Sequence, residues 1–334
     1  MKITSLFFEI TNKCNKRCSY CYNRENYDYD IDNHLISADL INTLVDEVRS
    51  VGADMIILSG GEPTTHPDLY DIIDHVMQNH MYCKINSNAF DCEKLIKIAE
   101  KYRNKIHIQF TIDGYYQTHN HFRGQGDYEH ILASIIKIRT TGFDGNISVR
   151  YNIHSAYSDN YEVVKVYNDI GRYVDYIYLS PIIGKTEFPI SIKEYKVLSK
   201  TICSTSFDKK GRVSLFLPPM SCTLKNINKS TALSPLIDVF GNVYLCQMSL
   251  YKNDFCLGNI NNSSLCDILS YQNIMLTSDK IKKNIICNKQ CSMKLLCDGG
   301  CKGICTKDQG DRYCDLRKMC LMSDIKFKNY QCWG

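Results

Sequence analysis

Three cysteines near the start of the chain have a spacing that suits iron–sulfur chemistry. Cys14, Cys18 and Cys21 form the pattern C-x3-C-x2-C, and the next cysteine along the chain is Cys83. Thiolates of cysteine hold iron–sulfur clusters, so this triad can bind three irons of a [4Fe–4S] cubane. The fourth iron is then left open, as chemistry on a bound ligand requires. A zinc knuckle would instead need a fourth ligand close by.

Short apolar strands alternate with amphipathic helices from residue 1 to about residue 205, and the triad directly follows the first strand. The sequence predicts strands over 3–10, 55–59, 82–86, 106–112, 147–153 and 174–179. It predicts helices over 38–51, 67–79, 92–103, 128–141, 160–171 and 192–203. Six βα units in series indicate an α/β fold, a partial (β/α)6 TIM-type barrel with the helices outside a parallel sheet.

Further residues able to bind a ligand come at the ends of the second, third and fourth predicted strands. In barrels of this kind the functional groups sit at the carboxyl ends of the strands. Glycines there let a backbone approach another group closely, and hydroxyl and guanidinium groups suit a ribose and a carboxylate. The candidates are Gly60, Gly61, Glu62, Pro63, Asn88, Thr111, Asp113 and Arg123.

These patterns resemble the signatures of the radical S-adenosylmethionine (SAM) superfamily. Tyr20 stands where the family has an aromatic residue before its last cysteine, and residues 60–63 resemble its GGEP motif. Residues 111–123 resemble its S-φ-D-G…H-x-x-x-R pattern, with Thr in place of Ser. The resemblance implies that the free iron chelates SAM, that an electron then releases a 5′-deoxyadenosyl radical, and that the eight candidates above bind SAM.

A second, cysteine-rich part of the chain follows the barrel, and we place the domains at 1–210 and 211–334. Near Pro218 the periodicity weakens, while cysteine, glycine and asparagine become frequent. This half resembles the SPASM domain, a carrier of auxiliary clusters, and Leu257-Gly-Asn-Ile resembles its LGNI segment. The cysteines that match its pattern are Cys222, Cys246, Cys287, Cys291, Cys297, Cys301 and Cys314.

The SPASM resemblance implies two auxiliary [4Fe–4S] clusters, and so three clusters with the one that binds SAM. Cys287, Cys291, Cys297 and Cys314 would hold one of them, although three residues separate Cys287 from Cys291 where the family has two. Cys222, Cys246 and Cys301 would hold the other. Its fourth ligand is Cys256, Cys305 or an open site, and Cys305 or Cys320 are alternatives to Cys314. The remaining cysteines in apolar patterns are expected in the core: Cys83, Cys92, Cys203 and Cys266.

The expected activity is oxidative modification of a ribosomally made peptide, by a thioether or carbon–carbon crosslink. The alternative is formylglycine formation on a protein Cys or Ser, as in anaerobic sulfatase maturases. Those enzymes have an acidic base after the G-x4-C cysteine, where this chain has Gln247, which is no useful base at neutral pH. A non-catalytic iron–sulfur electron carrier is a distant alternative. The catalytic acid or base is not indicated.

Composition limits the classes of partner that we expect for this chain. The net charge of +4 is weak, without a basic run that would indicate nucleic acid. No apolar stretch reaches the length of a membrane span and no signal peptide is recognisable, so we expect a cytoplasmic protein. The reductant is expected to be a flavodoxin or ferredoxin. Because the first strand begins at residue 3, a peptide leader would need a separate binding protein or the barrel itself.

Overall fold

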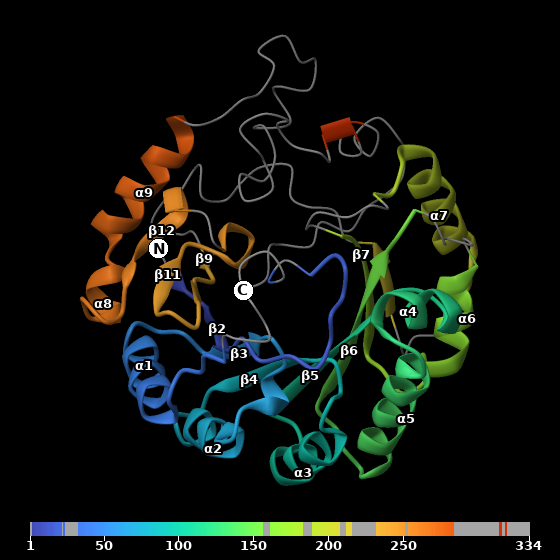
Figure 1. Cartoon of the computed structure of the whole chain (residues 1–334), viewed down its shortest axis with the longest axis horizontal. Helices are drawn as coiled ribbons and strands as arrows, with labels where there is room; N and C mark the ends of the chain where they lie inside the picture. Colours follow the sequence, from blue (N-terminus) through green and yellow to red (C-terminus); the bar gives the residue numbers. More distant parts are fainter. Residues whose placement is uncertain are drawn as a thin grey trace.

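The computed structural model describes residues 2–21, 23, 33–155, 161–182, 189–207, 212–215, 232–250, 253–283, 314, 315 and 318. A ten-stranded sheet dominates it, in the order β12-β11-β10-β2-β3-β4-β5-β6-β7-β8. All neighbouring strands in the run β10-β2-β3-β4-β5-β6-β7-β8 pair in parallel. Figure 1 shows this sheet as an open arc with α1, α2, α3, α5, α6 and α7 along its outer side, which confirms the partial barrel.

The strands are β1 (Lys2–Ile3), β2 (Ser5–Thr11), β3 (Met55–Gly60), β4 (Tyr82–Ser87), β5 (Ile106–Ile112), β6 (Asn146–Ile153), β7 (Tyr176–Pro181), β8 (Arg212–Leu215), β9 (Ala232–Leu233), β10 (Leu236–Ile237), β11 (Asn242–Tyr244) and β12 (Cys256–Asn259). The helices are α1 (Ala38–Ser50), α2 (Leu69–Gln78), α3 (Cys92–Tyr102), α4 (Tyr116–Arg123), α5 (Asp127–Thr140), α6 (Glu162–Ile170), α7 (Ile192–Ser204), α8 (Leu265–Ile268) and α9 (Tyr271–Lys283). Short 3-10 turns are η1 (Pro63–Thr65), η3 (Gln247–Ser249) and η4 (Asn253–Phe255).

All six predicted strands and all six predicted helices are present, with ends displaced by at most three residues. One helix beside the site, α4, was not predicted. Its sequence, Tyr-Gln-Thr-His-Asn-His-Phe-Arg, is mostly polar, and yet Thr118, His119 and Asn120 are buried. A helix that buries polar groups shows no apolar stripe, so periodicity does not find it.

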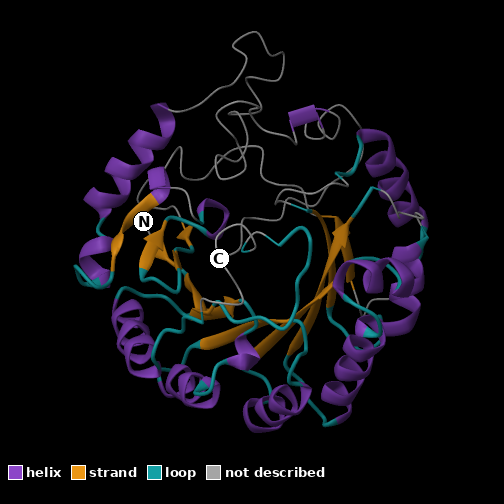
Figure 2. Ribbon diagram, viewed as in Figure 1, coloured by secondary structure: helices purple, strands orange, loops and turns teal. Residues whose placement is uncertain are grey.

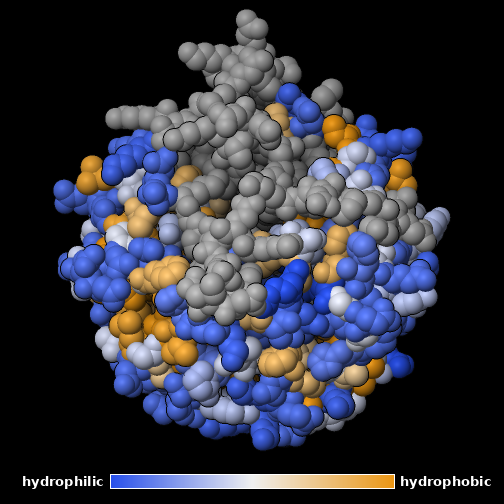
Figure 3. Space-filling view, in the orientation of Figure 1, coloured by the Kyte–Doolittle hydropathy of each residue, from blue (hydrophilic) through white to orange (hydrophobic). Residues whose placement is uncertain are grey.

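Fully buried and half-buried residues alternate along β5, which shows that the two faces of the sheet differ. In β5, Ile106, Ile108, Phe110 and Ile112 are at most 1% exposed and belong to the main apolar core, whereas the residues between them are half-buried. Successive side chains of a strand point to opposite faces, so the apolar set faces the helices and the other set faces the concave side of the arc. In Figure 3 the visible outer surface of the helices is largely hydrophilic, as this inward packing requires.

The described strands of the second half continue the sheet of the barrel. β10 pairs in parallel with β2, and β11 and β12 then add an antiparallel hairpin, visible at the end of the arc in Figure 2. The backbone N–H of Leu265, at the start of α8, donates to Glu47 Oε2 of α1 at 2.8 Å. The auxiliary part is therefore anchored to the edge of the barrel by both sheet and helix contacts.

Two expectations about core cysteines are wrong. Cys83 is 1% exposed within the core, as predicted, and Cys92 is half-buried at the start of α3. Cys203 on α7 and Cys266 on α8 are exposed instead, because each lies on the side of its helix that faces away from the sheet. Among the described helices, none has both the length and the apolar character of a membrane span.

Candidate functional site

The loop that carries the cysteine triad is fixed to the end of β3 by backbone hydrogen bonds. Gly61 N–H donates to Thr11 O at 2.7 Å, and Glu62 N–H donates to Lys13 O at 2.8 Å. A Cβ on Gly60 would lie 2.1 Å from Thr11 O, and one on Gly61 would lie 2.3 Å from Lys13 O. Here the glycines are required because two backbones approach closely, just before Cys14.

The three thiols of the triad lie near one another. Cys18 is buried and Cys14 and Cys21 are partly exposed. Burial raises the pKa of Cys14 to about 12, and the nearby Cys18 and Cys21 contribute to this rise. Burial likewise raises the pKa of Cys18. A bound iron would offset this cost, because it stabilises the thiolate.

The three thiols of the triad suit an iron–sulfur cluster. In a cubane each thiolate binds its own iron, so three neighbouring cysteines can hold three of its irons. Asn88 Nδ2 donates to Cys14 Sγ at 3.7 Å, and Lys16 N–H donates to the same sulfur at 3.4 Å. Such bonds to a ligating sulfur orient it and tune the cluster.

Glu62 holds the ends of two strands together. Its Oε1 accepts from Thr64 N at 3.1 Å, from Thr64 Oγ1 at 2.8 Å and from Ser87 Oγ at 2.7 Å. Its Oε2 accepts from Asn88 N at 2.6 Å. Burial raises the pKa of this carboxyl group, and these hydrogen bonds oppose the rise. Glu62 thereby positions Asn88 beside Cys14, while Pro63 starts the buried turn η1.

A buried network, which we call the anchor network, joins Tyr20, Asp113, Arg123 and Asn152. The Tyr20 hydroxyl and Arg123 Nε both donate to Asp113 Oδ2. Arg123 Nη2 donates to the Tyr20 oxygen at 2.7 Å, and Asn152 Nδ2 donates to Asp113 Oδ1 at 2.7 Å. Burial by itself raises the pKa of Asp113, but Arg123 beside it brings the pKa well below its ordinary value. The cysteine loop is thus attached to the ends of β5 and β6.

A second link attaches the same loop to α4 and α5. Lys16 Nζ lies 2.5 Å from Asp127 Oδ1. Asp127 Oδ2 lies 3.1 Å from His119 Nε2, and His119 Nδ1 accepts from Asp113 N–H at 3.0 Å. His119 is fully buried between the two aspartates. A chain of contacts therefore runs from Lys16 in the cysteine loop through Asp127 and His119 to the backbone at the end of β5.

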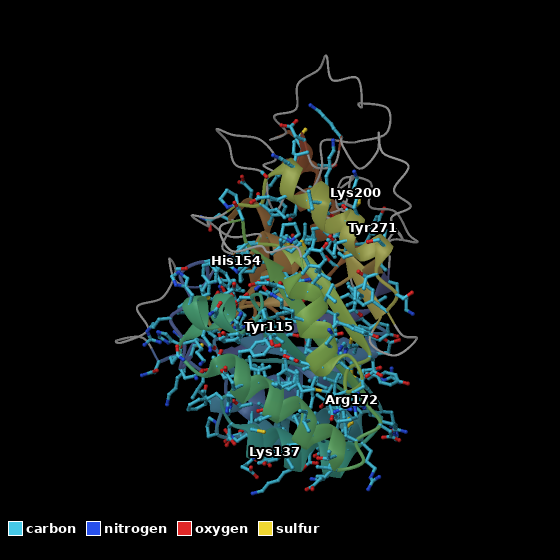
Figure 4. All side chains as sticks on the ribbon, turned by 90° about the vertical axis from the view of Figure 1, so that its right-hand side faces the viewer. Tyr115, Lys137, His154, Arg172, Lys200 and Tyr271 are labelled. Carbon is cyan, nitrogen blue, oxygen red and sulfur yellow. The ribbon has the colours of Figure 1, made fainter. Side chains whose placement is uncertain are left out.

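His154, labelled in Figure 4, completes the surroundings of Tyr20 from the end of β6. Its ring stacks on Phe122 at 3.8 Å between centroids and meets the Tyr20 ring edge-on at 5.2 Å. Its Nε2 lies 3.6 Å from Asp113 Oδ1, beyond hydrogen-bond distance. Sequence reasoning did not select Asn152 or His154. The signal that would have found them is a polar residue at every second position toward and just past the end of a predicted strand.

The candidates for SAM contact come together around the cysteine loop. Asn88, Asp113 and Arg123 all bond to that loop directly. Thr111 lies on the concave face of β5, beside Arg150 of β6. Because the carboxylate of Glu62 and the Asp113–Arg123 pair bind protein groups, their observed part in the structure is to hold the loop and its neighbours in place.

In the second half, the structure describes three of the cysteines expected as cluster ligands or as alternatives to them. Cys246 follows β11, and Cys256 begins β12 opposite Tyr244. Ser249 Oγ donates to Cys246 O at 2.6 Å, and Gln247 is exposed directly after Cys246. Cys314 is partly exposed. The other expected ligands and alternatives lie outside the described residues: Cys222, Cys287, Cys291, Cys297, Cys301, Cys305 and Cys320.

Curated relatives match parts of this chain. Mycofactocin maturase MftC from Mycobacterium ulcerans is 22% identical over 272 residues, which are 76% of this chain and 71% of that protein. Fe-coproporphyrin III synthase from Methanosarcina barkeri is 27% identical over 44% of this chain and 36% of its own length. The AdoMet-dependent heme synthase of the same organism is 31% identical over 42% of this chain and 40% of its own length. The chain thus spans well under half of the two Methanosarcina proteins.

Solved structures share the fold over nearly the whole chain. The structure of anSMEcpe with bound AdoMet and the Cp18Cys peptide has a TM-score of 0.70 at 15% identity, covering 95% of both chains. Streptococcus suis SuiB bound to S-adenosylmethionine has a TM-score of 0.72 at 14% identity, covering 92% of this chain and 75% of that one. At such identities the likeness establishes the fold.

Family models match both halves of the chain. Residues 8–170 match the radical SAM superfamily, and residues 232–297 match SPASM, an iron–sulfur cluster-binding domain. The first match contains the triad and all eight candidates for SAM contact, and the second contains Cys246 and Cys256. With the open barrel and the anchored cysteine loop, these matches identify the chain as a radical SAM enzyme that carries a SPASM domain.

Proposed function

We propose that this enzyme cleaves SAM reductively and uses the resulting radical to modify a ribosomally made peptide, forming a thioether or carbon–carbon crosslink. When bound, the cluster and SAM supply the 5′-deoxyadenosyl radical that abstracts hydrogen from the substrate. The observation that carries the proposal is the attachment of the cysteine loop over the concave face of the sheet, through Tyr20–Asp113 and Lys16–Asp127. It is supported by the similarity to MftC over 76% of this chain.

The residues of this chain would hold and orient the cofactors. Cys14, Cys18 and Cys21 would bind the cluster, and Asn88 would orient Cys14 through its bond to the sulfur. Gly60, Gly61, Glu62, Pro63, Thr111, Asp113 and Arg123 would shape the SAM site, the charged members of this set by fixing the loop and strand ends.

We further propose three [4Fe–4S] clusters, with two in the SPASM domain and a boundary near residue 210. Cys222, Cys246 and Cys301 would bind one auxiliary cluster, and Cys287, Cys291, Cys297 and Cys314 the other. The electron left on the product would pass through these clusters, making the overall change a two-electron oxidation. A flavodoxin or ferredoxin would supply the electron for SAM cleavage, and a separate protein or the barrel would bind the leader peptide.

Formylglycine formation is the second candidate function, because the cysteine pattern of the second half also resembles that of the anaerobic sulfatase maturases. The residue after the G-x4-C cysteine opposes it: Gln247 is exposed there and offers no carboxylate. A product from a sulfatase peptide would reverse this preference.

Anaerobic reconstitution tests the proposal directly. The holoenzyme is incubated with SAM, a reductant and short peptides encoded beside its gene, and products are read by mass spectrometry. A peptide lighter by two hydrogen atoms, together with 5′-deoxyadenosine, supports crosslinking. Cys14→Ala should abolish both products, whereas Cys203→Ala, at an exposed cysteine, should retain them. Unaltered peptide masses, or turnover by Cys14→Ala, would refute the proposal.

A further inference from the structure

Lys16 lies in the turn between the first two cysteines of the triad, and both its backbone and its side chain are bonded. Its backbone N–H donates to Cys14 Sγ at 3.4 Å, and its Nζ lies 2.5 Å from Asp127 Oδ1. The side chain of Lys16 is 19% exposed and that of Asp127 only 2%. Pairs of exposed charges contribute little to stability, but a pair with a buried partner is screened less by the solvent. The contact with Asp127 therefore holds the side chain of Lys16 in one place.

Asp127 is itself fixed by His119. His119 Nδ1 accepts from Asp113 N–H at 3.0 Å, so the ring hydrogen is on Nε2, which lies 3.1 Å from Asp127 Oδ2. His119 is fully buried, and Asp127 is the first residue of α5. Each oxygen of the carboxylate thus accepts from a different donor. The oxygen that faces Lys16 is kept there by the bond that the other oxygen makes.

The sulfur of Cys14 is at the other end of this chain of contacts. It accepts from Lys16 N–H and, at 3.7 Å, from Asn88 Nδ2. Hydrogen bonds to the sulfurs of a cluster favour its reduced form, which carries one more negative charge, and so raise its reduction potential. A backbone N–H keeps its direction only while the turn keeps its shape, and the side chain of Lys16 ties this turn to α5.

The charge of Asp127 acts against the effect of its contact with Lys16. Burial is the main cause that raises the pKa of the Cys18 thiol, and the carboxylate of Asp127 adds to the rise. A negative charge that disfavours a thiolate also disfavours the added electron of a reduced cluster, and so lowers the reduction potential. Removal of this charge alone would therefore raise the potential, whereas loss of the contact with Lys16 would lower it.

We infer that Asp127 is a positioning residue for the SAM-binding cluster: through Lys16 it keeps an N–H on the Cys14 sulfur and raises the reduction potential of that cluster. The inference rests on the proposed cluster at Cys14, Cys18 and Cys21, but not on the class of substrate. A higher potential favours the transfer of one electron from a flavodoxin or ferredoxin, which converts [4Fe–4S]²⁺ to [4Fe–4S]⁺. Asp127 thus acts on the electron transfer that precedes SAM cleavage.

A potentiometric titration of the reconstituted holoenzyme, followed by electron paramagnetic resonance, tests the inference. The signal of this cluster is the one that Cys14→Ala lacks, which separates it from the auxiliary clusters. In Asp127→Asn we expect the equilibrium constant for its one-electron reduction to fall about tenfold, which is a potential lower by about 59 mV. The amide offers one oxygen where the carboxylate offers two, so Lys16 and His119 cannot both keep an acceptor. Asp144→Asn, at an exposed position before β6, is the control and should leave the potential unchanged.

The sign of the change separates position from charge. A higher or unchanged potential in Asp127→Asn would overturn the inference, because only the loss of a negative charge would then be felt. If Asp127→Asn binds no iron, Asp127→Glu decides. It keeps the charge but displaces the carboxylate, so the potential should again fall, and an unaltered potential would contradict the positioning role. A wild type without the signal that depends on Cys14 would contradict the proposed function instead.

Discussion

The anchor network and a deeper set of polar residues on the concave face occupy neighbouring strands but differ in how their polar groups are bonded. The deeper set is Lys84, Asn86, His107, Gln109 and Ser148. In the anchor network, the carboxylate of Asp113 accepts from Tyr20, Arg123 and Asn152, and its charge is balanced within the protein. Among the deeper residues, His107 and Gln109 bond to Ser148, and Asn86 keeps a buried acceptor that no described donor reaches. The comparison indicates that the anchor network holds the cysteine loop to the strand ends.

The largest expected effect comes from breaking the anchor network. Asp113→Ala leaves the Arg123 guanidinium buried without its carboxylate, which should lower the free energy of unfolding by about 3–5 kcal/mol. Loss of the bond to Tyr20 should also release the cysteine loop and reduce the iron content. Denaturant unfolding and iron analysis measure both changes. Lys137→Ala, in an exposed pair with Glu93, should alter neither; a stable, iron-replete Asp113→Ala would refute the anchoring role.

Gly61→Ala tests how closely the cysteine loop is held to β3. Its Cβ would lie 2.3 Å from Lys13 O, so the two backbones must separate, at a cost of about 1–3 kcal/mol. The iron content after reconstitution should fall with it. Gly52→Ala is the control, because Gly52 also has an unusual backbone conformation (φ +93°) but has no atom within 4 Å of its Cβ position. Equal iron in both variants would contradict a positioning role for Gly61.

The smallest effect is a dependence of stability on pH. Because the pKa of His107 is lowered to about 3 in the fold, the unfolded chain binds a proton first as pH falls below about 6.5. His107 thus supports folding above that pH, and this support declines by about 1 kcal/mol for each pH unit below it. Unfolding of wild type and His107→Gln from pH 7.5 to 5.5 should show a shallower slope in the variant.

Much of the fold could be predicted because its signals are local. The strands at 106–112 and 147–153 differ from the surrounding helices in hydrophobic period, and the observed β5 and β6 match them within one residue. Helix α4 could not be found this way, since three of its four buried residues are polar. These are Thr118, His119 and Asn120, which bind partners from other elements. Cys203 and Cys266 lie in apolar patterns and were predicted to be buried. Whether another element covers such a position depends on parts of the chain that are distant in sequence, and both cysteines are exposed.

The sequence by itself determined that three cysteines follow a strand and that polar groups follow the next strands, because spacing and periodicity are properties of the chain. Only the tertiary structure decided what those groups bind. Parallel pairing brings Ser87 and Asn88 to Glu62, and Asn152 to Asp113. Strand register likewise placed Lys84, His107 and Arg150 on one concave face, although 66 positions separate the first from the last. Charges so distant in sequence interact only when folding brings them together in a medium that screens them weakly.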